Sequence, residues 1–250
     1  AGWKKTAREW RAQKERTMSG AYNWAKQRFV RGGDDSSIVS LTYKEAREMG
    51  FTDTEADDFC KNIATALTGG GTETSALSMM WFVVAMAIYP EVQERAQREI
   101  DEVVGSNRLP TIEDRASLPY IERLLTEIVR WHPAVPLGAP HICTEENEYR
   151  GYRIPKGAIM LGHITATARE EHIYKNAEIF DPDRFLDPTV PPPQAFGWGL
   201  RICPGQHFFT EIFYFEVVLM LATLRIERCK DENGKETIPS EERTSNSAVA

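Results

Sequence analysis

Residues 196–205 read Phe-Gly-Trp-Gly-Leu-Arg-Ile-Cys-Pro-Gly and place Cys203 between a glycine-rich turn and the start of a predicted helix. Proline is favoured at the first position of a helix, so Pro204 makes Cys203 the expected cap residue. A sulfur there faces unpaired backbone N–H groups and the positive end of the helix dipole. This setting favours the thiolate form of cysteine and the ligation of a metal by sulfur.

Glycines and an arginine surround this cysteine. Gly197, Gly199 and Gly205 let the backbone turn tightly and pass close to a flat, bulky object. Arg201 can pair with an anionic group on that object, because it lies two residues before the cysteine. Without these neighbours, a lone cysteine would more simply be a small buried hydrophobe. Together the features predict a thiolate cradle for haem iron.

The segment resembles the haem-binding loop of the cytochrome P-450 family, the haem-thiolate monooxygenases, whose pattern is F-x-x-G-x-R-x-C-x-G. Five positions match this pattern, namely Phe196, Gly199, Arg201, Cys203 and Gly205. The resemblance implies that Cys203 is the axial ligand of haem b and that Arg201 holds a propionate. A zinc site built on Cys203 and His207 is disfavoured, because zinc needs four ligands and the remaining cysteines have no matching spacing.

The composition is that of a globular protein with an acidic balance. Its 250 residues contain 37 Asp and Glu against 30 Lys and Arg, so no basic field favours nucleic-acid binding. A chain of this length buries a real core and usually forms one or two domains. The cysteines at 60, 143, 203 and 229 contain no C-x-x-C spacing, which argues against a disulfide framework and favours a reducing environment.

Hydrophobic periodicity predicts a mainly helical chain with minor β structure. Helices are expected over residues 3–30, 54–89, 90–104, 119–131 and 204–224. Residues 149–153 and 158–161, separated by Pro155-Lys156-Gly157, are expected to form short strands or a hairpin, and residues 181–193 a proline-rich connector. The last helix is expected to bury Phe208, Phe209, Ile212, Phe213, Phe215 and Leu219. The polar tail from Ser240 gives no structural signal.

A glycine cluster lies inside the second long helical pattern. Residues 68–75 read Thr-Gly-Gly-Gly-Thr-Glu-Thr-Ser, and each interior glycine costs about 1 kcal/mol relative to alanine. The cluster is either a plain break between two helices or a place where another molecule approaches the backbone closely. A phosphate loop is disfavoured, because no Gly-Lys-Ser/Thr follows.

This cluster resembles the oxygen-binding motif of the same family, (A/G)-G-x-(D/E)-T. The matching residues are Gly70, Gly71, Glu73 and Thr74. The resemblance implies that the two glycines leave room for dioxygen. It also implies that Thr74 and Glu73 are the catalytic residues, which relay protons to the bound oxygen.

Glu127 and Arg130 lie three residues apart on a predicted helix, so they share a face and can pair. Alone, such a pair is most simply a solvated surface pair. Here it resembles the family's E-x-x-R helix, whose carboxylate takes a second arginine from a P-x-R-F segment, matched by Arg184 in residues 182–185. A carboxylate held by two guanidinium groups can be stable when buried, and the resemblance implies a structural role beneath the haem.

His141 follows Pro140 in a short extended segment. A lone histidine is more often a satisfied surface or core group. In microsomal members of the family, however, a histidine or arginine at this place contacts a haem propionate. The resemblance therefore implies that His141 is a propionate partner and that residues 135–138 border the substrate pocket.

The resemblance extends from residue 1 to about residue 235 and implies the C-terminal half of the cytochrome P-450 fold, one incomplete haem-binding domain over residues 1–250. The front helices and final strands are expected to be missing, which leaves apolar helix faces partly uncovered. We expect a monooxygenase that inserts one atom of O₂ into a small apolar organic substrate, with electrons from an NADPH-dependent flavoprotein reductase. The alternative is a truncated, catalytically inactive haem-binding or interaction protein.

The longest apolar run, near residues 76–89, is too short to cross a bilayer, so we expect no transmembrane segment in this chain. The chain opens on Ala1 rather than Met, and we expect a fragment or processed product of a longer parent. The resemblance implies that the parent lies at the cytosolic face of the endoplasmic reticulum membrane. An N-terminal anchor upstream of this chain would hold it there.

Overall fold

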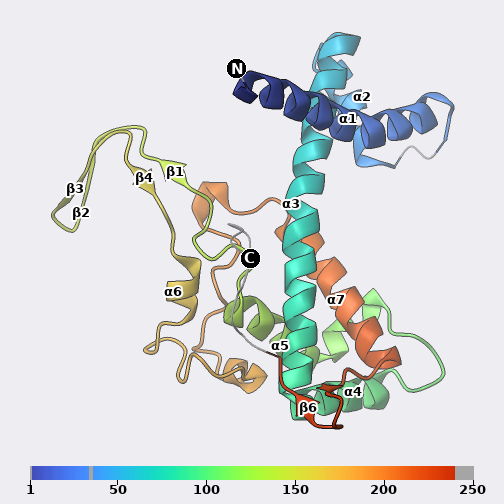
Figure 1. Ribbon diagram of the computed structural model, residues 1–250, viewed down its shortest axis with the longest axis vertical. Helices are drawn as coiled ribbons and strands as arrows, with labels where there is room; N and C mark the ends of the chain where they lie inside the picture. The colour runs from blue at the N-terminus through green and yellow to red at the C-terminus, as the bar shows by residue number, and fades with distance from the viewer. Residues whose placement is uncertain (1, 34–35, 240–250) are drawn as a thin grey trace. The chain divides into compact units, whose positions relative to one another are not determined.

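A computed structural model describes residues 2–33 and 36–239 of the chain (Figure 1). The tail from Ser240 lies outside these described residues. The helices are α1 (Gly2–Val30), α2 (Ile38–Glu48), α3 (Asp53–Ile88), α4 (Pro90–Val103), α5 (Pro119–Trp131), α6 (Ile164–Ala168) and α7 (Gln206–Thr223), with 3-10 turns η1 (Ile112–Ser117), η2 (Pro182–Leu186) and η3 (Gly199–Arg201). The strands are β1 (His141–Ile142), β2 (Asn147–Tyr149), β3 (Tyr152–Ile154), β4 (Ile159–Met160), β5 (Cys229–Lys230) and β6 (Glu236–Thr237). The prediction of a mainly helical chain with minor β structure is confirmed.

The chain divides into two compact units, Ala1–Thr72 and Glu73–Ala250, and the boundary falls inside α3. In the first unit, Tyr22, Val39 and Cys60 form a small buried cluster that joins α1, α2 and the start of α3. The predicted single domain over residues 1–250 stays a prediction.

A polar group borders this small cluster. The hydroxyl of Tyr22 donates to the carboxylate of Asp57 at 2.7 Å, and the ammonium of Lys26 donates to the same oxygen. Burial acts to raise the pKa of Asp57, but the hydrogen bonds from Lys26 and Tyr22 outweigh it, so the pKa is lowered. The charge of Asp57 is therefore stabilised by the helix that packs against it.

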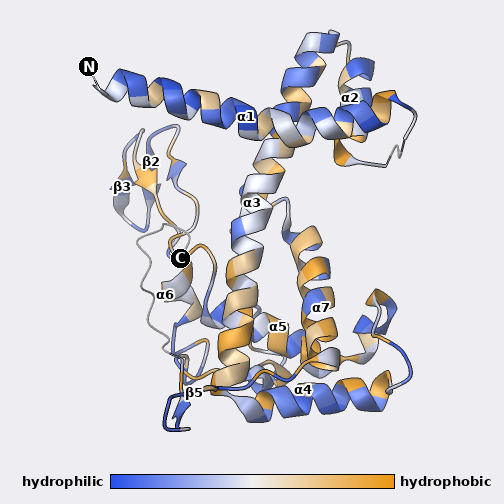
Figure 2. Ribbon diagram, turned by 45° about the vertical axis from the view of Figure 1, so that its right-hand side comes forward, coloured by the Kyte–Doolittle hydropathy of each residue, from blue (hydrophilic) through white to orange (hydrophobic). Residues whose placement is uncertain are grey.

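In the second unit, α4, α5 and α7 pack together around one large apolar core (Figure 1). The end of α3 joins this core, since Phe82 and Met86 are fully buried in it. Trp81 of α3 meets Trp131 of α5 edge to face, with ring centroids 6.0 Å apart. In Figure 2 the apolar colour follows α7 and the second half of α3.

The predicted helix ends are confirmed where proline and glycine mark them. Pro90 is at the start of α4, and Gly105 follows its end with φ 77°, a conformation that favours glycine. Pro119 begins α5, which ends at Trp131, two residues before Pro133. These residues act locally, so their effect on the backbone can be read from the sequence.

The predicted strand over residues 149–153 is wrong. The segment is a hairpin in which β2 and β3 pair antiparallel, with Tyr149 opposite Tyr152. Arg150 and Gly151 form its two-residue turn with φ 51° and 82°, the conformation that matches the twist of the flanking strands. β4 pairs instead with β1, which places His141 opposite Met160.

α7 buries less of its surface than its sequence predicts. Phe213 is 3% exposed, as expected, but Phe208 is 69% exposed, and Ile212 and Phe215 are each more than one-third exposed. The prediction of burial is wrong for these three residues, because no described segment covers that face of the helix. The expectation of uncovered apolar surface is confirmed here.

Among the described helices, α3 alone is long and apolar enough to cross a membrane by length and composition. The apolar run over residues 76–89, too short by itself, forms the second part of this helix. Core helices of water-soluble proteins meet the same criteria. Length and composition are therefore the same for α3 as a membrane-spanning helix and as a core helix.

Candidate functional site

Cys203 lies in a tight loop between Phe196 and the start of α7. Its backbone N–H donates to the carbonyl oxygen of Phe196 at 2.8 Å and closes the loop. Gly197 and Gly199 adopt φ 83° and 60°, a conformation that other residues rarely take. The thiol is free and exposed. The backbone therefore holds a single sulfur at the surface in a constrained turn.

The prediction that Cys203 caps the helix is wrong by two residues. α7 begins at Gln206 with Gly205 as its cap, and the N–H of Gln206 donates to the carbonyl of Cys203 at 3.3 Å. Pro204 therefore lies inside this turn rather than at the first helical position. A Cβ on Gly205 would lie 3.7 Å from the sulfur, so any side chain there would contact it.

Two aromatic residues fix the loop to its surroundings. Phe196 contacts Phe209 of α7 with ring centroids 5.5 Å apart. Trp198 packs against Gly162, which follows β4, so closely that a Cβ on that glycine would overlap the ring. This second contact ties the cysteine loop to the segment after the β1–β4 pair. The sequence analysis missed it, because neither residue carries a local signal for the other.

The two predicted propionate partners lie on different elements. Arg201 ends η3 and His141 begins β1, and both side chains are exposed. Within the part of the chain that the structure describes, no hydrogen bond or ion pair engages either side chain. Their roles toward a propionate stay predictions.

The glycine cluster does not break α3. The helix continues through Gly69–Gly71, so the plain helix break is wrong. A Cβ built on any of these glycines meets no described atom within 4 Å, and packing against the described chain therefore does not require glycine there. In the next turn, Glu73 is exposed and Thr74 is half-buried. Their catalytic roles stay predictions.

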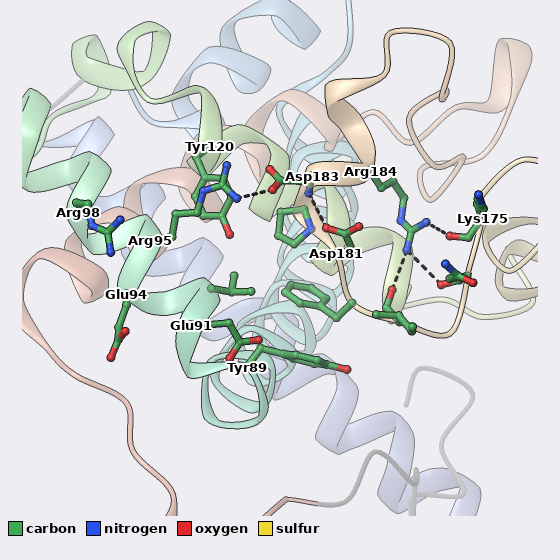
Figure 3. Close-up of a pocket in the computed structure, with 15 residues that line it drawn as sticks. Tyr89, Glu91, Glu94, Arg95, Arg98, Tyr120, Lys175, Asp181, Asp183 and Arg184 are labelled. Carbon is green, nitrogen blue, oxygen red and sulfur yellow. Dashed lines mark hydrogen bonds and ion pairs between the residues drawn. The ribbon is translucent and has the colours of Figure 1, made fainter.

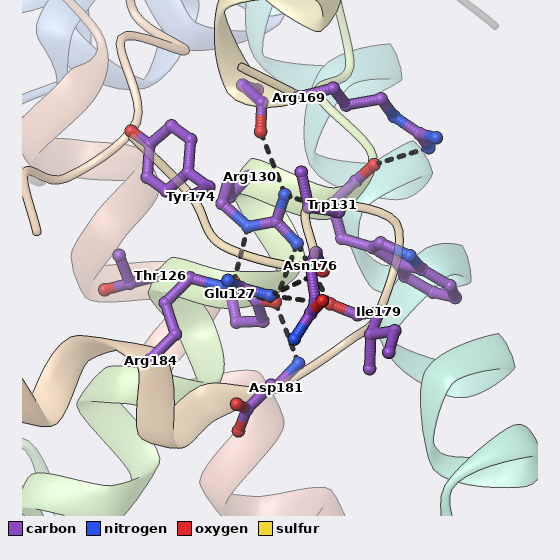
Figure 4. Close-up of polar contacts among 12 residues, drawn as sticks. Thr126, Glu127, Arg130, Trp131, Arg169, Tyr174, Asn176, Ile179, Asp181 and Arg184 are labelled. Atoms are coloured by element: carbon purple, nitrogen blue, oxygen red, sulfur yellow. Dashed lines mark hydrogen bonds and ion pairs between the residues drawn. The ribbon is translucent and has the colours of Figure 1, made fainter. Parts of the chain in front are cut away.

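Glu127, Arg130 and Arg184 form a buried ion-pair cluster (Figure 4). Arg130 donates to both carboxylate oxygens at 2.7 and 2.8 Å, and Nε of Arg184 lies 3.2 and 3.3 Å from the same two oxygens. The backbone N–H of Asp181 adds another donor at 2.8 Å. Because the Glu127 and Arg130 side chains are fully buried, the predicted pairing is observed and the solvated surface pair is wrong.

The same arginines bind the segment that follows α6. Arg130 donates to the backbone carbonyl of Ala168, the last residue of α6, and to those of Ala177 and Ile179 in this segment, at 2.8–3.3 Å. Tyr174 of this segment lies 5.5 Å from the Arg130 guanidinium, and burial raises the pKa of Tyr174. A buried charge is stable when it is paired and its donors are satisfied. The cluster therefore fixes α5 to residues 168–184.

A surface pocket of about 620 Å³ lies between α4 and residues 175–184 (Figure 3). Arg95 lies 4.3 Å from the ring of Tyr120 and pairs with Asp183 at this pocket. These two charges therefore offset each other at the wall of the pocket. Of the predicted site residues only Arg184 lines it, so the pocket is distinct from the cysteine loop.

The fold and the cysteine loop agree with one protein family. The sequence model of the cytochrome P-450 family matches residues 12–245. This chain belongs to the cytochrome P-450 family. The match includes the cysteine loop and the Glu127 cluster, so the resemblance drawn from the motifs is confirmed.

Several relatives are similar over nearly the whole chain. A cytochrome P-450 monooxygenase of Ampulloclitocybe clavipes, claR, is 39% identical over 246 residues, which cover 96% of this chain and 45% of claR. Cytochrome P-450 monooxygenase 98 of Postia placenta is 36% identical over 250 residues, which cover 97% of this chain and 48% of the relative. The chain thus spans about half the length of the curated relatives it matches.

A solved structure is similar as well. A zebrafish cytochrome P-450, solved with progesterone, superposes with a TM-score of 0.60 at 30% identity. The superposition covers 69% of this chain and 39% of the zebrafish chain. The predicted fold, a partial cytochrome P-450 fold, is confirmed.

The family implies a haem cofactor, and the residues present fit one. Haem presents a broad apolar face, two carboxylates and an iron that accepts a thiolate. The cysteine loop supplies an exposed thiol, a cation at Arg201 and, on the following helix, exposed apolar side chains at Phe208 and Ile212. This donor set matches the chemistry of the cofactor.

Proposed function

We propose that this protein acts as a haem-thiolate monooxygenase, which inserts one atom of O₂ into a small apolar organic substrate and reduces the other to water. The exposed thiol of Cys203, held in a closed loop in a chain of this family, carries the proposal. When bound, haem supplies oxygen activation, which a thiolate ligand favours by donating electron density. The fungal relatives are named monooxygenases, which supports the reaction class.

The residues around the thiol would hold the cofactor. Cys203 supplies the sulfur ligand, and its exposure leaves the sulfur accessible. Arg201 and His141 carry exposed side chains and would each pair with a propionate. Gly199 keeps the loop in a backbone conformation that a side chain would strain. The protein thereby supplies binding and orientation.

The glycine cluster of α3 would border the substrate. Gly70 and Gly71 leave open space next to the helix backbone. Glu73 and Thr74 lie one turn further along and would hold and move protons there, since a carboxylate and a hydroxyl can both relay them. The Glu127 cluster, by contrast, has a structural role, because its charges are satisfied within the protein.

Electrons would come from an NADPH-dependent flavoprotein reductase, and the parent protein would lie at the cytosolic face of the endoplasmic reticulum membrane. Both are what the resemblance to the microsomal branch of the family implies. Incubating the haem-loaded protein with substrate, reductase and NADPH tests the partner, since substrate-dependent NADPH consumption should require the reductase. Consumption that is independent of it would contradict this assignment.

The absorption spectrum of the haem-reconstituted, reduced protein under CO tests the ligand. We expect a strongly red-shifted Soret band of the thiolate type. Cys203→Ala should abolish it, whereas Cys229→Ala, which removes another exposed cysteine, should preserve it. A band that survives in Cys203→Ala would overturn the assignment. If no band forms, the measurement is repeated with the N-terminal half of the parent added. A band that then appears means that the haem site was incomplete, and continued absence of the band means that the site itself no longer binds haem through Cys203.

A haem-binding or interaction protein without turnover is the alternative function. It retains Cys203 as the haem ligand, since the thiol is exposed, but assigns no catalytic role to Glu73 and Thr74. It predicts a thiolate-type band without oxygen-dependent conversion of any substrate. Conversion of a substrate by the haem-loaded protein would exclude it.

A further inference from the structure

Phe209 links the cysteine loop to the apolar core of the second unit. Its ring centroid lies 5.5 Å from that of Phe196, at the start of the loop, and 5.1 Å from that of Phe213, one turn further along α7. Phe213 is 3% exposed and belongs to the core. Aromatic rings at such distances attract one another beyond the effect of their buried area. The three residues therefore form a continuous aromatic series from the core to the cysteine loop.

Two backbone hydrogen bonds connect this aromatic series with the sulfur-bearing residue. The carbonyl of Phe196 accepts the N–H of Cys203 at 2.8 Å. The N–H of Phe209 donates to the carbonyl of Gly205, two residues after the cysteine, at 2.8 Å. Cys203 therefore lies in a short segment whose two ends are joined by the contact between the rings of Phe196 and Phe209. A displacement of the Phe196 ring would move the carbonyl that holds the Cys203 N–H.

The side chains next to Cys203 contribute little packing. Ile202 and Pro204, on either side of the cysteine, are both exposed. The contact of Trp198 with the segment after β4 comes before η3, which separates it from the cysteine along the chain. The side chain of Phe196, by contrast, is half-buried and reaches α7. The position of the sulfur therefore depends on how firmly the Phe196 ring is held.

We propose that Phe209 is a positioning residue for Cys203 and that it acts through the ring of Phe196. The inference rests on the proposed function, because a fixed sulfur matters to a ligand of haem iron. Groups around a metal ligand orient it and thereby tune its binding. Without the Phe209 ring, Phe196 loses its contact with α7, and the loop opens more often. The hydrogen bond that holds the Cys203 N–H then breaks each time the loop opens.

Hydrogen exchange of the haem-free chain tests the positioning without a cofactor. Phe209→Ala removes two aromatic pairs and should accelerate exchange of the Cys203 N–H at least about tenfold. Exchange at Leu125, which is buried in α5, should accelerate much less. Phe209→Leu keeps most of the apolar volume and should recover part of the protection. Phe51→Ala is the matched control, because it removes a ring pair with the same centroid distance, 5.5 Å, from the first unit and should leave exchange at Cys203 unchanged.

The haem-loaded chain gives a second readout. Under CO, the share of reduced haem with the thiolate-type Soret band should fall in Phe209→Ala, recover in part in Phe209→Leu and stay unchanged in Phe51→Ala. If the unmodified chain shows no such band even with the N-terminal half of the parent added, the proposed function fails, and exchange alone decides whether Phe209 holds the loop.

Three results would overturn the positioning role. The first is unchanged exchange at Cys203 in Phe209→Ala, and the second is an undiminished thiolate band in that variant. The third is equal acceleration of exchange at Cys203 and Leu125, which would make Phe209 a residue that stabilises the whole core rather than the cysteine loop.

Discussion

The Glu127 cluster and the Cys203 loop place reactive groups in opposite ways. Glu127 is fully buried and receives donors from Arg130, Arg184 and a backbone N–H. Cys203 is exposed on a loop whose own backbone is hydrogen-bonded, but its thiol is left open. A group that the chain satisfies itself stabilises the fold, whereas a group held open on a rigid backbone is available to another molecule. Substitutions should therefore affect stability at the first site and ligand binding at the second.

The largest expected effect is at the buried cluster. Glu127→Ala leaves two guanidinium groups without their carboxylate, and removing one partner of a buried pair typically costs about 3–5 kcal/mol of unfolding free energy. Urea unfolding followed by circular dichroism measures it. Glu146→Ala, which breaks the exposed pair with Arg153, should change the unfolding free energy far less, because solvent screens an exposed pair. Equal losses of unfolding free energy in the two variants would contradict the conclusion that the buried pair stabilises the fold more than the exposed pair.

The second-largest effect on stability is expected at the contact between Trp198 and Gly162, which anchors the cysteine loop. Gly162→Ala places a methyl group against the Trp198 ring, and such overpacking costs about 1–3 kcal/mol. The double variant with Trp198→Ala should recover part of this loss, because the obstructing ring is gone. A double-mutant cycle on the unfolding free energy checks the coupling. If the two substitutions are additive, the loop is not held by this contact.

Much of the helical frame could be predicted because its signals are local. Pro90, Gly105 and Pro119 set helix ends through their own backbone preferences. The pairing of Glu127 with Arg130 follows from their spacing on one helix. The site motifs were equally readable, since the residues of the cysteine loop are consecutive in the chain.

Two of the errors concern features that depend on neighbours remote in sequence. The packing of Trp198 on Gly162 joins segments whose sequences carry no sign of each other. The amphipathic pattern of α7 predicts burial of Phe208, but burial also requires a covering segment, and no described one lies there. The turn at Arg150 was missed because a non-glycine residue with positive φ is uncommon.

Alanine substitution in the glycine cluster of α3 should raise the unfolding free energy, whereas the same substitution at Gly162 should lower it. Gly71→Ala meets no described atom within 4 Å and replaces a poor helix former, so the chain should gain about 1 kcal/mol of unfolding free energy. Thermal unfolding of the haem-free chain measures this gain. A loss of stability would mean that the glycine is needed for packing, rather than kept for a molecule that approaches the helix.

Tyr174 adds a pH-dependent test of the buried region. Its hydroxyl donates to the carbonyl of Pro191 at 3.1 Å, so Tyr174→Phe should cost about 1 kcal/mol at neutral pH. Burial raises the pKa of Tyr174 in the folded state, so its contribution is present below about pH 10, the usual tyrosine value, and is lost as the pH rises further. The difference between the two proteins should therefore shrink above that pH. A constant difference in urea unfolding from pH 7 to 11 would contradict the assignment.

The smallest effect on stability should come from the residue with the largest expected effect on function. The Cys203 side chain is exposed and only its backbone closes the loop, so Cys203→Ala should change the unfolding free energy of the haem-free chain by less than about 0.5 kcal/mol. The same substitution should remove the stabilisation that added haem gives, because ligand binding to the folded state raises stability by mass action. Thermal unfolding with and without haem separates the two effects. A large loss without haem would place Cys203 with the Glu127 cluster, as a residue that serves the fold.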